Sequence, residues 1–389
     1  SGGPRYRADV GVKAGRIVEI GRIRGSATER IDAEGHIVSP GFIDGYTHMD
    51  AQVAWDPLLT PASWHGISTV LTGNCGVTFA PVRTQDKELL AGMMESVEDI
   101  PKNSIMLGLP WDWNSFGEYL DSVQRQAPAL NIAALVGHAA TRFYVMGDRA
   151  VEEQPTNHEI EEIATLAGQS VLEGAVGFSI NRLKAHRLPD GRPIPGTFAA
   201  EEELVAIARE VGKAGGFLQS VIEAQPLDEE MRLIEAQVAA AGTHMLFSAP
   251  WLPGPGLDSA YQPAIDAMRE RGLDVTGTTQ PRAAGFLSGL STNILFGLRF
   301  KGDAWRKLQR TEVADRLPLI RDPIFRGRLV SEAKDAEIAD HVGQTLSSPR
   351  FSLPCNRTFW MVTETRPDYT QPPENSLARL ADRAGEHPA

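Results

Sequence analysis

The stretch Pro40–Pro81 constrains the fold of this chain more than any other part of its sequence. A short apolar run, Phe42–Tyr46, leads directly into the polar segment Thr47–Asp50. A second run, Ile67–Thr72, is rich in β-branched residues and ends just before the turn that holds Cys75. Two strands that are each followed by polar side chains at the carboxyl end are typical of a βαβ unit in a parallel α/β protein. Because the reactive groups of parallel barrels gather at the carboxyl ends of the strands, we predict a functional site there.

Strands and helices continue to alternate after this unit. The crossover between its two strands is predicted to be helical around Pro61–Gly66. Five further buried strands are predicted at Asn131–Val136, Ala175–Ser179, Gly216–Val221, His244–Ser248 and Leu273–Thr278. Helices are predicted among them at Asp86–Val97, Ser115–Gln124, Glu159–Leu172, Glu201–Ala214, Glu229–Ala241 and Tyr261–Arg271. Seven alternations favour a TIM-type (β/α)8 barrel over an open doubly wound sheet.

The two ends of the chain differ from this pattern. Strand-like runs Asp9–Val12 and Arg16–Ile20 flank a turn and predict a hairpin, and Ile31–Val38 predicts another turn-bearing pair. Residues 1–39 are therefore interpreted as part of a small β-sandwich module, and residues 40–389 as the barrel. After residue 279 the predicted elements are helices only, at Asp303–Arg310, Pro323–Ala333 and Asn375–Gly385. We expect both modules to be incomplete here, with an eighth strand and a C-terminal β segment beyond residue 389.

Composition excludes several classes of protein. A chain of 389 residues can hold one large barrel, and its 42% hydrophobic content is ordinary for a globular protein. The formal net charge of −12, with no compensating basic block, argues against nucleic acid as a partner. Two cysteines cannot form a disulfide framework, and no apolar run reaches the length of a membrane span. We expect a cytoplasmic protein that binds a small molecule and no membrane, and we leave homo-oligomer formation open.

Several motifs resemble the amidohydrolase superfamily, in its N-acyl-D-amino-acid deacylase (D-aminoacylase) branch. They are ADVGVKAGRIVEIG, PGFIDGYTHMD, WHGISTVLTGNCGVTFAP and ALVGHAATRFYVMG, with GAVGFSINR as a weaker match, and Gly215–Ala389 is similar only in its general layout. The cysteine of GNCG is the most specific signal, since most amidohydrolases bridge their metals through lysine or glutamate. The resemblance implies a TIM-barrel metallohydrolase with a small β-sandwich built from both termini. It also implies hydrolysis of amide bonds by metal-activated water.

His48 and Cys75 are the predicted metal ligands. Positions 46 and 48 share one face of an extended segment, and a thiolate at the neighbouring strand tip can complete a compact cluster. Zn²⁺ accepts nitrogen and sulfur ligands together, which makes it the predicted metal. Zinc lowers the pKa of a bound water to roughly 7, so that the water becomes a hydroxide nucleophile. Cys75 as a buried structural thiol is the simpler alternative.

Other ligands of the family pattern are missing from this chain. The first strand of the family carries His-x-His, whereas this chain has Tyr46-Thr47-His48. The Ser-His pairs of the fifth and sixth strands are replaced by serine followed by Val221 and by Ala249, whose aliphatic side chains cannot bind a metal. The family's last ligand, an aspartate on the eighth strand, is expected beyond the chain. We therefore predict one zinc ion rather than two, and binding of no metal at all is left open.

The catalytic residues are predicted to be Asp50 and His138. Asp50 lies two residues after His48 and is expected either to hold it by a hydrogen bond or to carry a proton. His138 follows the third strand, and it is expected either to contact the substrate or metal or to anchor its loop.

The substrate-binding residues are predicted to be Tyr46, Arg142, Tyr144 and Gln219. Arg142 offers a bidentate fork for a carboxylate, with Tyr144 beside it, although both residues could equally be solvated. Gln219 is expected to line the pocket near the position of a missing histidine, and Tyr46 to do so on the first strand.

Three hypotheses about function follow. The first is an amidohydrolase that cleaves the C–N bond of an N-acyl amino acid or a related small or cyclic amide at a reduced metal site. The second is a metal-free protein of the same fold, in which Tyr46, His48, Asp50 and His138 perform other acid–base chemistry. The third is a non-catalytic barrel subunit.

Overall fold

The computed structural model describes residues 4–98, 100–184, 186–223, 226–248, 257–279, 289–290, 302–342, 359 and 370–386. The chain divides into two compact units, Ser1–Gly41 and Phe42–Ala389, which are described separately below. No helix in the described ranges is long and apolar enough to cross a membrane.

The first unit contains the predicted hairpin. Strand β1 (Asp9–Lys13) pairs antiparallel with β2 (Arg16–Gly21) through a two-residue loop. Both loop residues have positive φ, 49° at Ala14 and 73° at Gly15, which is the backbone of the turn type that matches strand twist.

The second predicted pair, Ile31–Val38, does not form, and that prediction was wrong: the described part of the unit beyond β2 has no strand. Ile31, Ile37 and Val38 are 84%, 73% and 64% exposed. Because no neighbouring layer buries these side chains, strand pairing here gains little from the hydrophobic effect. The described residues therefore show a hairpin and not a sandwich.

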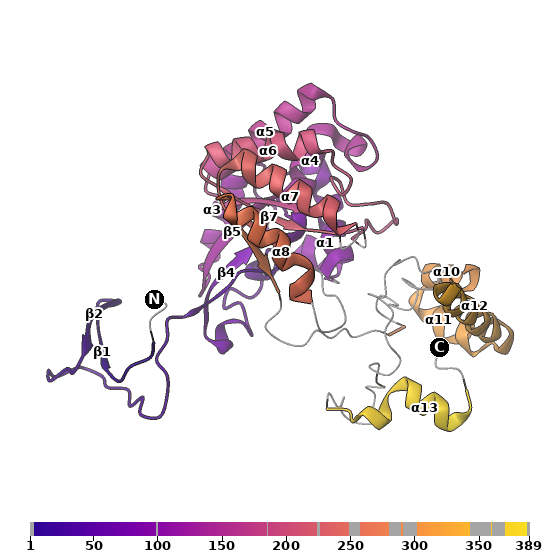
Figure 1. Ribbon diagram of the computed structural model, residues 1–389, viewed down its shortest axis with the longest axis horizontal. Helices are drawn as coiled ribbons and strands as arrows, with labels where there is room; N and C mark the ends of the chain where they lie inside the picture. The colour runs from indigo at the N-terminus through magenta and orange to yellow at the C-terminus, as the bar shows by residue number, and fades with distance from the viewer. Residues whose placement is uncertain are drawn as a thin grey trace. The chain divides into compact units, whose positions relative to one another are not determined.

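The second unit is built on one parallel sheet of seven strands whose order in space equals their order in the chain (Figure 1). Every neighbouring pair is parallel. The strands are β3 (Phe42–Asp44), β4 (Ile67–Thr72), β5 (Asn131–Gly137), β6 (Gly177–Asn181), β7 (Phe217–Val221), β8 (Met245–Ser248) and β9 (Val275–Thr278). A doubly wound sheet would reverse its strand order at a switch point, so sequential order fits the predicted TIM-type barrel. An eighth strand is not among the described residues.

The helices of this unit lie near their predicted positions. They are α1 (Lys87–Glu98), α2 (Lys102–Gly108), α3 (Phe116–Arg125), α4 (His138–Met146), α5 (Asn157–Leu172), α6 (Glu201–Lys213), α7 (Leu227–Ala241) and α8 (Leu257–Glu270). Ser115 and Thr156 begin α3 and α5 with reciprocal capping boxes to Glu118 and Glu159. Figure 1 shows α4 to α7 gathered along one side of the strands.

The crossover between β3 and β4 contains two short 3-10 helices, Gln52–Ala54 and Ser63–His65, and no α-helix. The second lies inside the helical segment predicted around Pro61–Gly66. Pro57 and Pro61 disfavour a longer helix here, because proline removes helical hydrogen bonds. Helices α2 and α4 were not predicted, and α4 begins immediately at His138 because β5 ends there.

The core lies between the sheet and its helices. All five residues of β6 are buried, as expected for a parallel strand covered on both faces. Phe79, Phe178 and Phe247 are fully buried in the same apolar cluster. Strand β6 extends to Asn181, beyond the predicted end at Ser179, because Asn181 pairs with Val221 of β7.

The C-terminal part contains a separate helical cluster. It consists of α10 (Asp303–Arg310), α11 (Val313–Arg321) and α12 (Pro323–Val342), packed around Trp305 and Phe325. Helix α12 continues past the predicted end at Ala333, α11 was not predicted, and α13 (Leu377–Ala384) lies inside the predicted Asn375–Gly385.

Candidate active site at the carboxyl ends of the strands

Cys75 lies on a tight turn that follows β4. Its own φ is 58°, and the flanking Gly73 and Gly76 have φ values of 78° and 69°. A Cβ atom on Gly73 would lie 2.2 Å from the carbonyl oxygen of Leu135, and one on Gly76 would lie 2.7 Å from the backbone nitrogen of Asn181. Both positions therefore require glycine, because the turn packs directly against other backbone.

This turn reaches across the barrel mouth to distant strands. The N–H of Gly76 donates to Oγ of Ser179 on β6 over 3.0 Å, and the Ser179 hydroxyl donates to the carbonyl of Gly73. The N–H of Cys75 donates to Oε1 of Gln219 on β7 over 3.3 Å. Gln219 is thus used to hold the Cys75 turn, and its amide nitrogen lies 3.5 Å from Oγ of Ser248 on β8. Cys75 is placed over the carboxyl ends of the parallel strands.

Tyr46 is the partner of the Cys75 thiol. The phenol oxygen and Sγ lie 2.6 Å apart, and either group can be the donor. Burial raises the pKa of Tyr46, and the nearby Cys75 raises it further. Burial also raises the pKa of Cys75, against the opposing hydrogen bond from Tyr46. At pH 7 the pair is therefore a hydrogen bond between two protonated, neutral groups.

His48 lies beside this pair with its ring nitrogens unsatisfied. Its ring meets that of Tyr46 edge-on with 5.9 Å between the centroids. The side chain is 9% exposed, and neither Nδ1 nor Nε2 has a hydrogen-bond partner among the described residues. Nε2 lies 3.2 Å from Oε1 of Glu98 without the alignment of a hydrogen bond. Burial, followed by the charge of His186, lowers the pKa of His48 to about 3, so the imidazole is neutral at pH 7.

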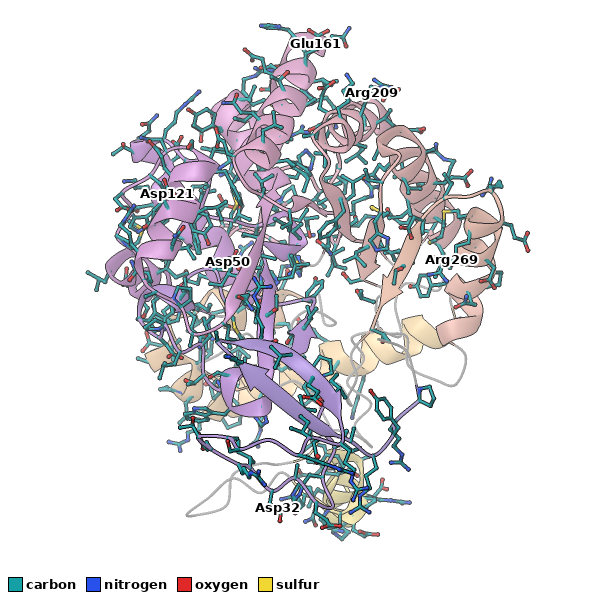
Figure 2. The ribbon with its side chains drawn as sticks, turned by 90° about the vertical axis from the view of Figure 1, so that its left-hand side faces the viewer. Asp32, Asp50, Asp121, Glu161, Arg209 and Arg269 are labelled. Atoms are coloured by element: carbon teal, nitrogen blue, oxygen red, sulfur yellow. The ribbon has the colours of Figure 1, made fainter. Side chains whose placement is uncertain are left out.

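Asp50 lies in the interior, 2% exposed, as Figure 2 shows. Burial raises the pKa of its carboxyl to about 7, although backbone hydrogen bonds from Asp50 itself and Gly73 oppose the shift. One carboxyl oxygen, Oδ2, has no partner in the described part of the chain. Of the two roles predicted for Asp50, the hydrogen bond to His48 is not formed, since neither His48 nitrogen has a hydrogen-bond partner among the described residues.

His138 belongs to a different, fully buried network. Its Nε2 lies 2.8 Å from Oε1 of Glu203 on α6, and Arg142 forms an ion pair with Oε2 of the same carboxylate. Arg142 also donates to the carbonyls of Ala150 over 3.1 Å and Glu153 over 2.6 Å. Burial alone would raise the pKa of Glu203, but His138 and Arg142 outweigh it and hold the pKa below its ordinary value.

These contacts change the interpretation of three predicted site residues. His138 anchors α4 to α6, which was the simpler of its two predicted roles. Arg142 is 3% exposed and its guanidinium is occupied by Glu203 and two carbonyls, so it does not offer a fork to a substrate carboxylate. Tyr144 lies with its ring under the guanidinium of Arg83, at 4.8 Å. No contact joins any of the three to Tyr46 or Cys75 among the interactions of the described residues.

Comparison with known proteins identifies the family. Residues 29–284 match the family described as the Amidohydrolase family. The chain belongs to the amidohydrolase family.

Two curated relatives of this chain come from Alcaligenes xylosoxydans xylosoxydans. It is 31% identical over 214 residues to a D-aminoacylase, which covers 55% of this chain and 40% of that protein. It is 32% identical over 288 residues to an N-acyl-D-glutamate deacylase, which covers 70% of this chain and 53% of that protein. The chain thus spans about half the length, or less, of these relatives.

Two solved structures share the fold of this chain. A D-aminoacylase with a binuclear metal centre superposes with a TM-score of 0.60 and 27% identity, covering 73% of this chain and 56% of that one. An N-acyl-D-glutamate deacylase from Bordetella bronchiseptica, complexed with zinc and a phosphonate mimic of the tetrahedral intermediate, gives a TM-score of 0.60 and 29% identity, covering 72% and 56%. The resemblance to the D-aminoacylase branch is therefore confirmed.

The described residues of this chain do not by themselves make a zinc site. His48 and Cys75 are donors that zinc accepts, and the unpartnered nitrogens of His48 suit a ligand. The thiol, however, is hydrogen-bonded to Tyr46, and the strand end of β7 carries the aliphatic Val221. No group of three or more His, Cys, Asp or Glu side chains in the described ranges is arranged to hold a metal. Ala249, the other replaced position, lies outside the described residues.

Three residues near this site were not found from the sequence. Glu98 ends α1 beside His48, Asn181 is the last residue of β6, and His186 lies in the segment that follows β6. The sequence offered one weak signal, a polar, proline- and glycine-rich excursion at Asn181–Phe198. In a barrel such an excursion follows the carboxyl end of a strand and therefore lies on the face that carries the site.

Proposed function

We propose that this chain carries the catalytic barrel of a hydrolase that cleaves the C–N bond of an N-acyl amino acid or a related small or cyclic amide. The observation that carries the proposal is the cluster of Tyr46, His48 and Cys75 over the carboxyl ends of β3 and β4. Parallel barrels perform chemistry at this face. The named relatives remove acyl groups from D-amino acids, which supports the substrate class.

The chemistry of the cluster suits a neutral amide. A neutral imidazole at His48 can donate a hydrogen bond from one nitrogen and accept one at the other. An amide group offers the matching carbonyl oxygen and N–H. Both nitrogens of His48 are buried without a hydrogen-bond partner among the described residues, so a substrate amide that reached them would satisfy groups that are costly to leave without hydrogen bonds. The proposed partner is therefore a small amide, with no part for nucleic acid or a membrane.

The metal-binding side chains among the described residues limit what zinc could do at this site. At most one ion can use His48 and Cys75, and its remaining ligands would have to come from outside the described residues. When bound, zinc supplies a nucleophilic hydroxide and polarises the scissile carbonyl. His48 and Cys75 would contribute nitrogen and sulfur, and Tyr46 would then release the thiol.

A panel of N-acyl-D- and N-acyl-L-amino acids, with and without added Zn²⁺, tests the proposal. We expect release of the free amino acid from at least one member, and loss of this activity in Cys75→Ala and His48→Ala. His158→Ala is the matched control, because that histidine is 79% exposed on α5. Absence of hydrolysis across the panel under both conditions would contradict the proposal.

A second candidate is metal-free acid–base chemistry on the same barrel. It is favoured by the hydrogen bond that occupies the Cys75 thiol and by the small number of metal donors among the described residues. Elemental analysis of protein purified without chelator separates the two candidates. Activity that survives chelation, in protein containing less than about 0.3 zinc per chain, supports metal-free chemistry, since a working metal site must be occupied.

A further inference from the structure

The segment between β6 and α6 carries a histidine that the sequence did not assign to the site. His186 is partly buried and lies in a loop, and Nδ1 of its ring lies 2.9 Å from Oδ1 of Asn181. Asn181 is the last residue of β6, and its backbone nitrogen packs against Gly76 of the Cys75 turn. His186 is therefore one hydrogen bond away from the residue on which the Cys75 turn rests.

A chain of hydrogen bonds determines which nitrogen of His186 carries the proton. The hydroxyl of Thr197 donates to the carbonyl of Ile194 over 2.8 Å, so its oxygen is left to accept. The side-chain NH₂ of Asn181 donates to that oxygen over 2.7 Å. The other atom of the amide, Oδ1, can only accept, and it faces Nδ1 of His186. Nδ1 must therefore carry the hydrogen.

The opposite nitrogen of His186 is then a hydrogen-bond acceptor. Burial lowers the pKa of His186 to about 4, so the ring is neutral at pH 7 and Nε2 bears a lone pair. No described residue forms a hydrogen bond with Nε2. His186 is also close enough to His48 for its charge to depress the pKa of that residue. Two neutral imidazoles, each with a nitrogen that no described residue hydrogen-bonds, therefore lie close enough to interact.

We propose that His186 is a substrate-binding residue, whose Nε2 accepts a hydrogen bond from the N–H of the scissile amide, and that Asn181 is the positioning residue that fixes its tautomer. This inference rests on the proposed amide hydrolysis and adds a recognition element to it. This role explains why His186 is held in the Nδ1–H form, because only that tautomer places the acceptor on Nε2, where it can receive the N–H of the substrate. An ester of the same shape has no N–H and lacks this contact.

The tautomer can be measured without any substrate. Nitrogen-15 NMR of the full chain with labelled histidine distinguishes a protonated ring nitrogen from an unprotonated one, and the signal of His186 is assigned by its absence in His186→Gln. We expect Nδ1–H with bare Nε2. Asn181→Asp, which keeps an acceptor opposite Nδ1, should retain this form, and Asn181→Leu should lose it. An Nε2–H ring in the unmodified protein would overturn the inference whatever the activity.

The substrate contact is tested by comparing an N-acyl amino acid with its ester analogue. Removal of the acceptor in His186→Asn should shift the amide-to-ester ratio of kcat/KM toward the ester by about tenfold, the value of one hydrogen bond in a buried site. His186→Gln, whose side-chain oxygen can reach the place of Nε2, should restore part of the preference. His158→Ala is the control and should leave the ratio unchanged.

The outcomes separate the inference from the proposed function. Hydrolysis with an unchanged ratio in His186→Asn leaves the proposed function standing and overturns the role of His186. Hydrolysis of no amide at all contradicts the proposed function and, with it, this substrate contact. A shifted ratio together with the Nδ1–H tautomer supports both.

Discussion

Two buried polar groupings at the mouth of the barrel have opposite properties. In the His138–Arg142–Glu203 network, a carboxylate neutralises a guanidinium and binds an imidazole, and most polar atoms have partners. Around His48, by contrast, neither imidazole nitrogen has a hydrogen-bond partner among the described residues, although Glu98 lies 3.2 Å from Nε2, and the neighbouring Tyr46 and Cys75 are neutral. Buried polar groups are normally satisfied, so the second grouping is the one that calls for a ligand. Both groupings contain a buried histidine, so the hydrogen bonding of the side chains, and not their residue type, distinguishes the structural network from the candidate ligand-binding site.

The largest effect is expected from removing the charge in the braced network. Glu203→Gln leaves Arg142 buried without a counter-charge, which should lower the free energy of unfolding by about 3–5 kcal/mol. Denaturant unfolding of the full chain measures the change. Glu161→Gln, at an exposed position of α5 (Figure 2), is the control and should change stability by no more than about 0.5 kcal/mol. Equal changes in the free energy of unfolding for the two variants would show that the network does not stabilise the fold.

A loss nearly as large is expected at the Cys75 turn. Gly76→Ala adds a Cβ 2.7 Å from a backbone nitrogen at a φ of 69°, and should cost about 3 kcal/mol through strain and displacement. Gly242→Ala shares the left-handed backbone, with φ of 63°, but meets no atom within 4 Å. It should cost about 1 kcal/mol, the penalty of the left-handed conformation alone. Comparing the thermal unfolding of the two variants separates the cost of the steric clash at residue 76 from the cost of the left-handed backbone conformation.

Acid should weaken the same network without any substitution. The pKa of Glu203 is lower in the folded protein than its ordinary value, so the folded state favours the carboxylate. Its stabilisation is fully present above the ordinary glutamate pKa of about 4.3 and is lost as pH falls through the lowered folded value. The difference in stability between the unmodified chain and Glu203→Gln should therefore shrink below that pKa. A difference that stays constant down to acid unfolding would contradict this assignment.

The smallest stability effect is expected at the unsatisfied grouping. Tyr46→Phe removes one hydrogen bond to Cys75 and should cost about 1 kcal/mol. Hydrolysis of the N-acyl amino acid should nevertheless fall, or the metal content change, because the thiol loses its only described hydrogen-bond partner. A variant with full activity and unchanged metal content would place Tyr46 outside the site.

The site residues that could be predicted are those whose position follows from the sequence immediately around them. His48 and Cys75 were found because each follows an apolar run, and parallel strands bring such positions to one edge. The prediction of Arg142 as a substrate-binding residue rests instead on the bidentate fork that arginine offers a carboxylate. In the structure its guanidinium binds Glu203, 61 residues away on α6, and no local sequence pattern predicts that contact.

The sequence by itself determined the alternation of strands and helices, the β-hairpin near the start of the chain and the family. These features depend on periodicity and turn residues, which act over a few neighbouring positions. Only the tertiary structure decided that Tyr46 closes on Cys75 from 29 residues away and that His138 is a brace. It also decided that the segment after β6 places His186 against Asn181, the residue on which the Cys75 turn packs. Such pairings follow from which side chains the packed strands and helices bring together, and that is a property of the whole fold.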